Sequence, residues 1–344
     1  MTTQRRKIRT APRNKTVTAF GLAERPRRNR GTAALRRLVR ETNLPVSSLV
    51  MPLFIVPGKK QRVPVNSMPG IERLSVDLLI DEAARLRDLG MSAVALFPCL
   101  PESLKDTRAT ESRNSAGLLP EAVAAVKSRV PELAVITDVA MDPYSSNGHD
   151  GLVEKGKILN DETLPILAGM ALTQAKAGAD MVAPSDMMDG RVGYIRRALD
   201  DAGYKDVGIL AYTAKYASVM YGPFRDALDS APQFGDKKTY QMDPANGDEA
   251  IREIAFDIAE GADSIMVKPG LAYLDIIYRA KSEFDVPVFA YQVSGEYALV
   301  KVGAAAGIGD HDALMMEKLI AFKRAGCSGI LSYFAADAAR LLHG

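Results

Sequence analysis

The feature that most constrains the fold is an eightfold alternation of short apolar runs with longer amphipathic segments. The apolar runs have the length of buried strands and cover residues 49–56, 93–97, 133–138, 180–184, 207–212, 264–268, 287–293 and 328–333. Helical periodicity lies between them, over residues 76–89, 121–129, 163–177, 192–202, 248–260, 274–283 and 313–325. Continuous apolar strands separated by helices are typical of a parallel sheet that is covered on its outer face. Eight such units predict an α/β fold, the closed (β/α)8 TIM barrel.

Glycine positions and a missing nucleotide-binding turn favour the closed barrel. Four of the predicted helices end at a glycine shortly before the next strand, namely Gly90, Gly178, Gly261 and Gly326. Glycine is expected at the C-terminal end of a helix, because it adopts the left-handed conformation without strain. The alternative is an open doubly wound sheet, but no Gly-x-Gly-x-x-Gly turn follows any predicted strand.

A basic segment precedes the barrel pattern. Residues 1–40 hold 13 lysines and arginines against the single acid Glu24, and of the chain's 44 basic and 42 acidic residues this leaves 31 and 41 for the remainder, about −10. We expect an extended arm over residues 1–32 and a barrel domain over residues 33–344, which begins with a short helix at 33–41. Such an arm can bind nucleic acid, direct a chain to an organelle or lie on an acidic surface of a neighbouring subunit. No aromatic stacking platform accompanies the arginines, so we favour the subunit arm and expect no nucleic-acid partner.

Composition predicts a soluble cytoplasmic protein. The chain is 47% hydrophobic and 25% charged, which is ordinary for a globular protein. Cys99 and Cys327 both lie in apolar surroundings, and two cysteines are too few for a disulfide framework, so a reducing cytosol is expected. Neither an uncharged apolar run long enough for a membrane span nor the apolar core of a signal peptide is found.

Two lysines close to strand ends are the main candidates for catalysis. Lys268 ends the strand at 264–268, and Lys215 follows the strand at 207–212 within three residues. Burial disfavours the ammonium form of a lysine and lowers its pKa, and a second lysine nearby acts in the same direction. A neutral amine attacks carbonyl carbons and forms a Schiff base. A single lysine of this kind more often extends from the core to water, but two at one barrel mouth favour catalysis.

The other predicted strand ends also carry polar side chains, which packing alone would not require. They are Asp138, Ser185 with Asp186, Gln292 with Ser294, and Tyr333. Active sites of barrel enzymes lie at the C-terminal ends of the strands. We therefore expect Asp138 and Ser185 to lie beside the substrate.

Six segments of the chain resemble the 5-aminolevulinate dehydratases, also called porphobilinogen synthases. They are SMPG at 67–70, APSDMMDGR at 183–191, AKYASVMYGPFRD at 214–226, YQMDP at 240–244, MVKPG at 266–270 and YQVSGEY at 291–297. The resemblance extends from end to end. It implies a lyase that condenses two molecules of 5-aminolevulinate to porphobilinogen with loss of two waters, in haem and chlorophyll biosynthesis. It also implies a homo-octamer.

The resemblance implies roles for individual residues. Lys268 matches the Schiff-base lysine of the first substrate, and Lys215 matches the lysine that holds the second. Carboxylate-binding roles are implied for Ser294 and Tyr333 toward the first substrate, and for Arg225, Lys237 and Gln241 toward the second. Some relatives carry arginine at position 237, and lysine keeps the charge but loses the bidentate geometry. The segment 217–235 is expected to be a mobile lid.

The metal requirement is expected to differ from that of the zinc-using relatives. Their three cysteines correspond to Ala140, Asp142 and Asp150 here, so a tetrahedral thiolate site cannot form. Oxygen donors leave two alternatives, a hard cation such as Mg²⁺ or no metal at all. Asp142 and Asp150 are then expected to orient the substrate amine. His149 lacks partner ligands and is expected to be structural or close to the substrate.

A second, allosteric Mg²⁺ site of some bacterial relatives matches Glu253. Glu249, Glu253 and Asp257 recur every four residues and define one stripe of a helix. A solvated acidic face is an equally good interpretation of this stripe. For the whole chain, the main alternative function is a class I Schiff-base aldolase, which needs only one lysine.

Overall fold

The structure is a computed structural model of the 344-residue chain and describes residues 25–230 and 232–343. The chain divides into two compact units, with the boundary between Asn43 and Leu44. The described part of the first unit holds a 3₁₀ turn, Pro26–Arg30, and helix α1, Ala33–Leu38, whose N-cap residue Thr32 accepts a hydrogen bond from the Leu35 amide. Most of the basic arm, residues 1–24, lies outside the described residues. The division into an arm at 1–32 and a barrel at 33–344 stays a prediction.

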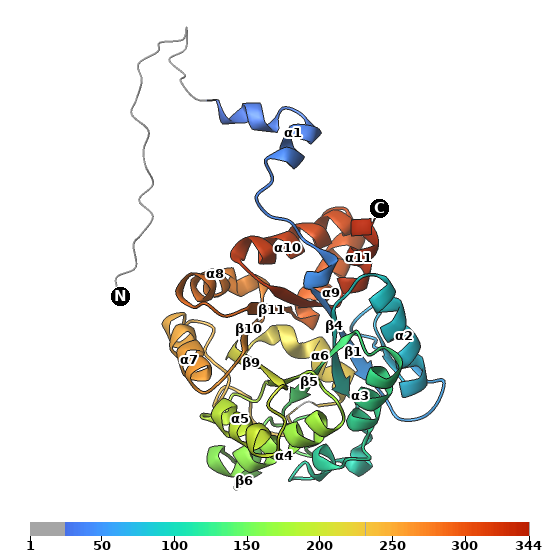
Figure 1. Ribbon diagram of the computed structural model, residues 1–344, viewed down its shortest axis with the longest axis vertical. Helices are drawn as coiled ribbons and strands as arrows, with labels where there is room; N and C mark the ends of the chain where they lie inside the picture. Colours follow the sequence, from blue (N-terminus) through green and yellow to red (C-terminus); the bar gives the residue numbers. More distant parts are fainter. Residues whose placement is uncertain (1–24, 231, 344) are drawn as a thin grey trace. The chain divides into compact units, whose positions relative to one another are not determined.

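The second unit is a closed parallel barrel, as predicted (Figure 1). Its strands, in the order of their pairing, are β1 (Leu49–Ile55), β4 (Ala93–Pro98), β5 (Ala134–Val139), β8 (Met181–Pro184), β9 (Gly208–Lys215), β10 (Ser264–Lys268), β11 (Val288–Gln292) and β12 (Gly329–Ser332). All neighbours are parallel, and the pairing of Leu49 with Ile330 joins β12 to β1 and closes the barrel.

The predicted helices cover the outside of this barrel. They are α2 (Val76–Asp88), α3 (Leu118–Arg129), α4 (Asn160–Lys176), α5 (Arg191–Asp201), α7 (Asp248–Ala259), α8 (Leu274–Glu283) and α10 (His311–Ala325). In α2, Leu79, Ala83 and Leu86 recur at helical spacing and are fully buried. Burial of each leucine contributes roughly 1.5–3 kcal/mol. The glycines predicted to end helices have left-handed conformations, with φ between 75° at Gly90 and 113° at Gly326.

One strand boundary was predicted wrongly by more than one residue. Strand β9 continues to Lys215 instead of ending at Tyr212, because Thr213 and Ala214 are fully buried and the ladder with β10 resumes after an irregularity. Lys215 is therefore part of the barrel wall and not of the following loop.

Several short elements were not predicted. They are the hairpins β2–β3 (Arg62–Pro64 and Glu72–Leu74) and β6–β7 (Leu152–Glu154 and Lys157–Leu159), and helices α6 (Gly222–Leu228), α9 (Ser294–Ala305) and α11 (Ala335–His343). Three-residue strands are too short to show alternation, and α9 begins within a glycine-containing stretch. Among the residues that the structure describes, no helix combines the length and the apolarity that crossing a membrane requires.

Candidate active site

The two candidate lysines lie side by side at the C-terminal edge of the barrel. Lys215 is the last residue of β9, Lys268 is the last residue of β10, and the two are register partners across the ladder. Both side chains are buried. The expectation that they share one barrel mouth is therefore met by the strand pairing itself.

Aromatic rings enclose the amine of Lys268. Its Nζ lies 5.1 Å from the ring centroid of Tyr212, 5.4 Å from Tyr221, 4.8 Å from Phe224 and 4.7 Å from Tyr291. Within the described chain, no carboxylate or carbonyl is hydrogen-bonded to this nitrogen. Burial, followed by the charge of Lys215, lowers the pKa of Lys268 to about 7. A large fraction of the amine is therefore neutral at physiological pH.

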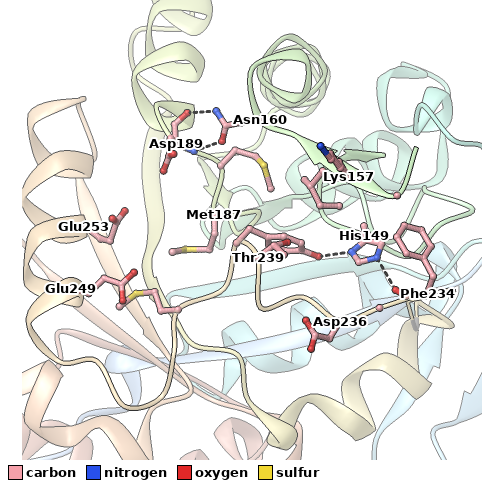
Figure 2. Close-up of a pocket in the computed structure, with 16 residues that line it drawn as sticks. His149, Lys157, Asn160, Met187, Asp189, Phe234, Asp236, Thr239, Glu249 and Glu253 are labelled. Carbon is pink, nitrogen blue, oxygen red and sulfur yellow. Dashed lines mark hydrogen bonds between the residues drawn. The ribbon is translucent and has the colours of Figure 1, made fainter. Parts of the chain in front are cut away.

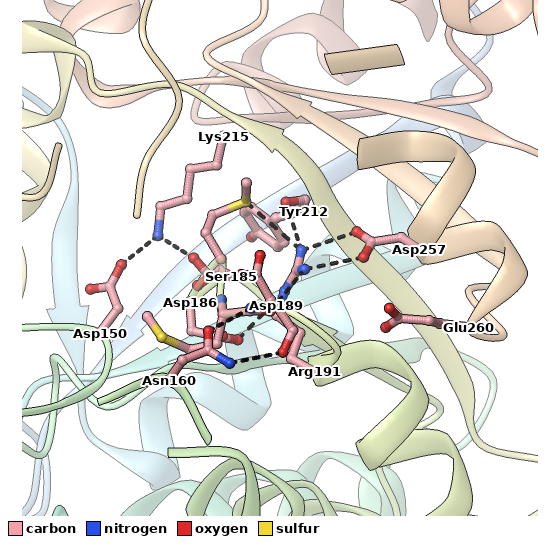
Figure 3. A network of polar contacts seen from close by, with 12 residues as sticks. Asp150, Asn160, Ser185, Asp186, Asp189, Arg191, Tyr212, Lys215, Asp257 and Glu260 are labelled. Carbon is pink, nitrogen blue, oxygen red and sulfur yellow. Dashed lines mark hydrogen bonds and ion pairs between the residues drawn. The ribbon is translucent and has the colours of Figure 1, made fainter. Parts of the chain in front are cut away.

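Lys215 has the opposite environment, because its ammonium group is paired. Its Nζ donates to Oδ2 of Asp150 at 2.9 Å and to the carbonyl oxygen of Ser185, as Figure 3 shows. The other oxygen of Asp150 accepts from Lys237 at 2.6 Å, and Lys237 also donates to Asp142 at 3.2 Å. Burial would raise the pKa of the Asp150 carboxyl, but the two lysines outweigh it and hold that pKa well below its usual range. The two lysines of the strand pair therefore differ in their surroundings, because the amine of Lys215 is ion-paired and that of Lys268 faces aromatic rings.

A second carboxylate, which is half-buried, lies close to these lysines. Asp138, near the end of β5, lies beside the Ser185 side chain. Burial raises the pKa of Asp138 to about 6, although the charges of Lys215 and Lys268 act in the opposite direction. Asp138 can therefore exchange a proton near neutral pH, whereas Asp150 stays ionised.

The predicted lid segment closes over the lysines. It contains a 3₁₀ turn, Val219–Tyr221, and helix α6, which were not expected within it. A small cavity of about 20 Å³ remains between lid and barrel, enough for about one water molecule. The side chains that line it are those of Asp142, Lys215, Tyr221, Phe224, Arg225, Lys237, Gln241 and Lys268. The carboxamide oxygen of Gln241 is buried and has no hydrogen-bond partner among the described residues.

Ser294 and Tyr333 do not line this cavity. The Ser294 hydroxyl accepts from the Phe224 amide at 2.9 Å and donates to the Met220 carbonyl at 3.2 Å. The Tyr333 hydroxyl is 2.9 Å from that of Tyr291. Each residue thus contacts one of the four aromatic residues around Lys268 rather than the cavity, Ser294 through the Phe224 backbone amide and Tyr333 through the Tyr291 hydroxyl.

Glu253 lines a different and larger cavity. This cavity has a volume of about 800 Å³, and Figure 2 shows Glu253, Glu249, Asp189, Asp236 and His149 on its walls. Both ring nitrogens of His149 are engaged, at 3.1 Å from the Tyr240 hydroxyl and at 3.1 Å from the Phe234 carbonyl oxygen. His149 thus supports the lid segment structurally, which was one of the two expected roles.

The acidic stripe on α7 is not uniformly solvated. Asp257 is buried and accepts two hydrogen bonds from the Arg191 guanidinium, at 3.0 and 3.1 Å (Figure 3). The interpretation as a solvated acidic face is therefore wrong for Asp257. In residues 25–230 and 232–343, no group of three or more histidine, cysteine, aspartate or glutamate side chains is arranged to hold a metal ion.

Sequence reasoning missed the enclosing rings, and it noted Asp186 only as a polar strand end without a role. Tyr221 and Phe224 lie inside a family motif but were not singled out, and Tyr212 was noted only as a strand end. Asp186 is fully buried, and burial raises its pKa to about 7, although Arg191 nearby acts in the opposite direction. The continuous apolar run at 207–212 gave no signal that the Tyr212 ring lies against the amine of Lys268.

A closed (β/α)8 barrel with two buried lysines at the C-terminal ends of neighbouring strands, and with the buried carboxylate of Asp150 beside them, defines the class of barrel enzymes. The family model for delta-aminolevulinic acid dehydratase matches residues 23–341. The chain belongs to this family. Its activity is that of a porphobilinogen synthase, a hydro-lyase of tetrapyrrole biosynthesis that acts on 5-aminolevulinate, and not that of an aldolase.

Individual relatives agree over nearly the full length. The chain is 55% identical over 325 residues to the dehydratase of Bradyrhizobium diazoefficiens, covering 94% of this chain and 92% of the relative. It is 52% identical over 322 residues to that of Synechocystis sp., covering 92% and 98%. The crystal structure of the Toxoplasma gondii dehydratase in complex with its product porphobilinogen is similar, with a TM-score of 0.91, 50% identity and coverage of 93% and 92%.

Proposed function

We propose that this chain joins two 5-aminolevulinate molecules through Schiff bases, with Lys268 as the first nucleophile. The observation that carries the proposal is the enclosed, unpaired amine of Lys268, with a pKa of about 7. The neutral amine attacks the ketone carbon of one substrate, and loss of water leaves an imine. The imine makes the neighbouring carbon acidic, so that bond formation to the second substrate proceeds over a moderate barrier.

Lys215 holds the second substrate in this proposal. Its ammonium group is paired with Asp150, so a proton must leave before its nitrogen can form an imine. Asp138, with a pKa of about 6, is the nearby group suited to receive a proton near neutral pH. Ser185 lies between the two, because its carbonyl oxygen accepts from Lys215 and its side chain lies beside Asp138.

We assign the carboxylate groups of the two substrates to different sets of residues. Arg225, Lys237 and Gln241 serve the second substrate, and their position on one small cavity supports this, because each carries N–H groups that can donate to a carboxylate. Ser294 and Tyr333 serve the first. Since their hydroxyls are bonded to the lid and to Tyr291, substrate must exchange these hydrogen bonds for its own.

We further propose that the enzyme is of the zinc-free type. The donor set does not fit zinc: Ala140 offers only a methyl group, and Asp142 and Asp150 already accept hydrogen bonds from Lys215 and Lys237. In this role Asp142 and Asp150 orient the amine of the substrate. Oxygen donors near Glu253, such as Glu249 on the same cavity, fit Mg²⁺, which would act away from the reacting atoms.

Chelation provides the test of this proposal. Protein treated with a zinc chelator is expected to form porphobilinogen from 5-aminolevulinate at its full rate, and added Zn²⁺ to have no effect. Added Mg²⁺ is expected to raise the rate a few-fold, and Glu253→Ala to remove this stimulation. Glu317→Ala, an exposed acid on α10, is the matched control and should respond like the unchanged protein. Restoration of a lost activity by Zn²⁺ alone would overturn the zinc-free assignment.

The N-terminal segment is proposed to assemble the chain into a homo-octamer in the cytoplasm. Helix α1 exposes Leu35, Leu38 and Val39, with Leu38 80% exposed, next to the basic residues Arg36 and Arg37. An apolar helix edge of this kind suits a protein partner, and no nucleic acid is proposed. The free thiols of Cys99 and Cys327 support a reducing compartment, which cell fractionation would test.

Light scattering tests the role of the segment. The full chain of 37.1 kDa is expected to give a mass near 300 kDa, about eight chains. Deletion of residues 1–31 is expected to give a smaller assembly, because the cationic arm that covers the neighbour is lost. An unchanged mass after the deletion would show that the arm does not make the assembly.

A further inference from the structure

The lid helix α6 is held at its C-terminal end by an arginine from outside the barrel. This helix has only seven residues, and the last four carbonyl groups of any helix lack partners within it. Arg73 of strand β3 donates from Nε to the Ala227 carbonyl oxygen at 2.7 Å and from Nη2 to that of Asp226 at 2.6 Å. A cation in this position also interacts favourably with the helix dipole.

A serine from the same hairpin binds the side of α6. The Ser67 hydroxyl donates to Oδ2 of Asp226 at 2.5 Å and lies 3.4 Å from the Pro223 carbonyl oxygen. Ser67 begins the SMPG motif, for which the sequence offered no role. The hairpin thus contacts both the first and the last turn of the lid helix.

The hairpin that carries these two residues is firmly attached to the barrel. Val65, Met68 and Ile71 are buried, so the turn around the SMPG motif is packed into the core. The Tyr297 hydroxyl of α9 donates to the Pro69 carbonyl oxygen at 2.6 Å. The hairpin is therefore a fixed support against which the lid helix can close.

On its other side, the lid meets the first turn of α9. There the Ser294 hydroxyl bridges the Met220 carbonyl and the Phe224 amide. Gly295 allows this approach, because a Cβ at that position would lie only 2.6 Å from the Met220 carbonyl oxygen. The lid helix is thus held between the hairpin and α9.

The position of α6 determines where two residues of the active site lie. Arg225 lines the catalytic cavity, and the Phe224 ring lies 4.8 Å from Nζ of Lys268. Arg73 does not line that cavity; it lines a separate one of about 340 Å³ together with Cys99 and Asp229. Arg73 therefore acts on the reaction through the lid and not by contact with the substrate.

We propose that Arg73, assisted by Ser67, is a positioning residue for porphobilinogen synthesis, a latch that keeps the lid helix over Lys268. This inference rests on the proposed roles of Arg225 and Lys268. The latch raises the fraction of molecules with a closed lid. Because substrate is held only by the closed form, the apparent affinity falls in proportion when that fraction falls.

The test compares variants of two arginines that have similar exposure and similar hydrogen-bond partners. Arg73 and Arg196 have side chains that are 15% and 17% exposed, and each donates to two backbone carbonyls. Arg196 bonds Val207 and Tyr204, ahead of β9 at the other end of the barrel. Arg73→Ala is expected to raise KM about tenfold. Arg73→Lys is expected to raise it by less, because lysine keeps the positive charge and one donor although it lacks the fork that reaches both carbonyls. Arg196→Ala is expected to leave KM unchanged.

Hydrogen exchange provides the second measurement. In Arg73→Ala, the amides of residues 219–229 are expected to exchange faster, while those of the barrel strands keep their rates. Unchanged lid exchange would overturn the latch, and so would a uniform increase over the whole barrel, which would indicate a general structural role. If Arg225→Ala leaves KM unchanged while Arg73→Ala still accelerates lid exchange, the carboxylate assignment fails and the latch stands.

Discussion

Replacement of Lys268 by arginine is expected to lower the rate of porphobilinogen formation by on the order of 10⁴-fold or more. Arginine keeps a cation and most of the volume, but it has no amine that can form an imine. The four aromatic rings around residue 268 would still be present, so the loss of rate would be due to the missing covalent step. The measurement is the rate of product formation at saturating 5-aminolevulinate.

Borohydride trapping separates chemistry from folding in this variant. Reduction in the presence of substrate is expected to label the peptide that contains Lys268 in the unchanged protein and to leave it unlabelled in Lys268→Arg. Since only the neutral amine attacks, labelling is expected to rise with pH through the pKa of about 7 and to level off above it. Lys127→Arg, which alters a lysine paired with Asp180 outside the site, should keep full activity and labelling. A trapped substrate on another residue with normal turnover would refute the assignment of Lys268.

Replacement of Asp150 by asparagine is expected to lower the free energy of unfolding by about 3–5 kcal/mol, the cost of removing one partner from a buried ion pair. The carboxylate is fully buried between Lys215 and Lys237, and its loss would leave both ammonium groups short of a counter-charge. Urea unfolding followed by circular dichroism measures this change. Activity is expected to fall as well, because the position of Lys215 depends on the same pair.

Two comparisons sharpen the Asp150 prediction. Asp142→Asn is expected to destabilise less, because Asp142 meets only Lys237, at 3.2 Å, and is more exposed. The pKa of Asp150 is lowered in the folded chain, so its contribution is present above the usual value near 3.8 and is lost as the pH falls further. The stability difference between the variant and the unchanged protein should therefore shrink in strong acid. Equal effects of Asp142→Asn and Asp150→Asn would contradict the central position of Asp150.

The barrel could be predicted from the sequence because its strands are buried on both faces and its helices are long enough to show periodicity. Strand β10 matches its predicted bounds, and the ends of α2 differ by one residue at most. The pattern failed where elements are short or irregular. Hairpin β2–β3 has strands of three residues, and α6 begins with Gly222 and Pro223, which locally indicate a turn.

The site was predictable only in part for a different reason. Lys268 ends one predicted strand, and Lys215 closely follows the strand before it. Local sequence patterns were therefore enough to predict that the two lysines lie close together. The ion pair of Asp150 with Lys237 joins residues 87 positions apart in loops, so only the folded chain brings them together. The engagement of Ser294 by the lid also depends on contacts across 70 residues. The family resemblance implied roles for Lys237, Asp150 and Ser294, but it did not indicate which residues they contact.

The enclosure of Lys268 has a consequence for when this enzyme is reactive. Two of its four rings, Tyr221 and Phe224, belong to the lid segment, while Tyr212 and Tyr291 belong to barrel strands. Displacement of the lid would admit water to the amine, and a hydrated lysine is protonated at neutral pH. The neutral nucleophile would therefore exist only while the lid segment covers the amine, and a proton would mask it in an open site. Stray aldehydes and ketones in the cell that cannot hold the lid shut would meet an ammonium ion instead of an amine, which protects the enzyme from unproductive adducts.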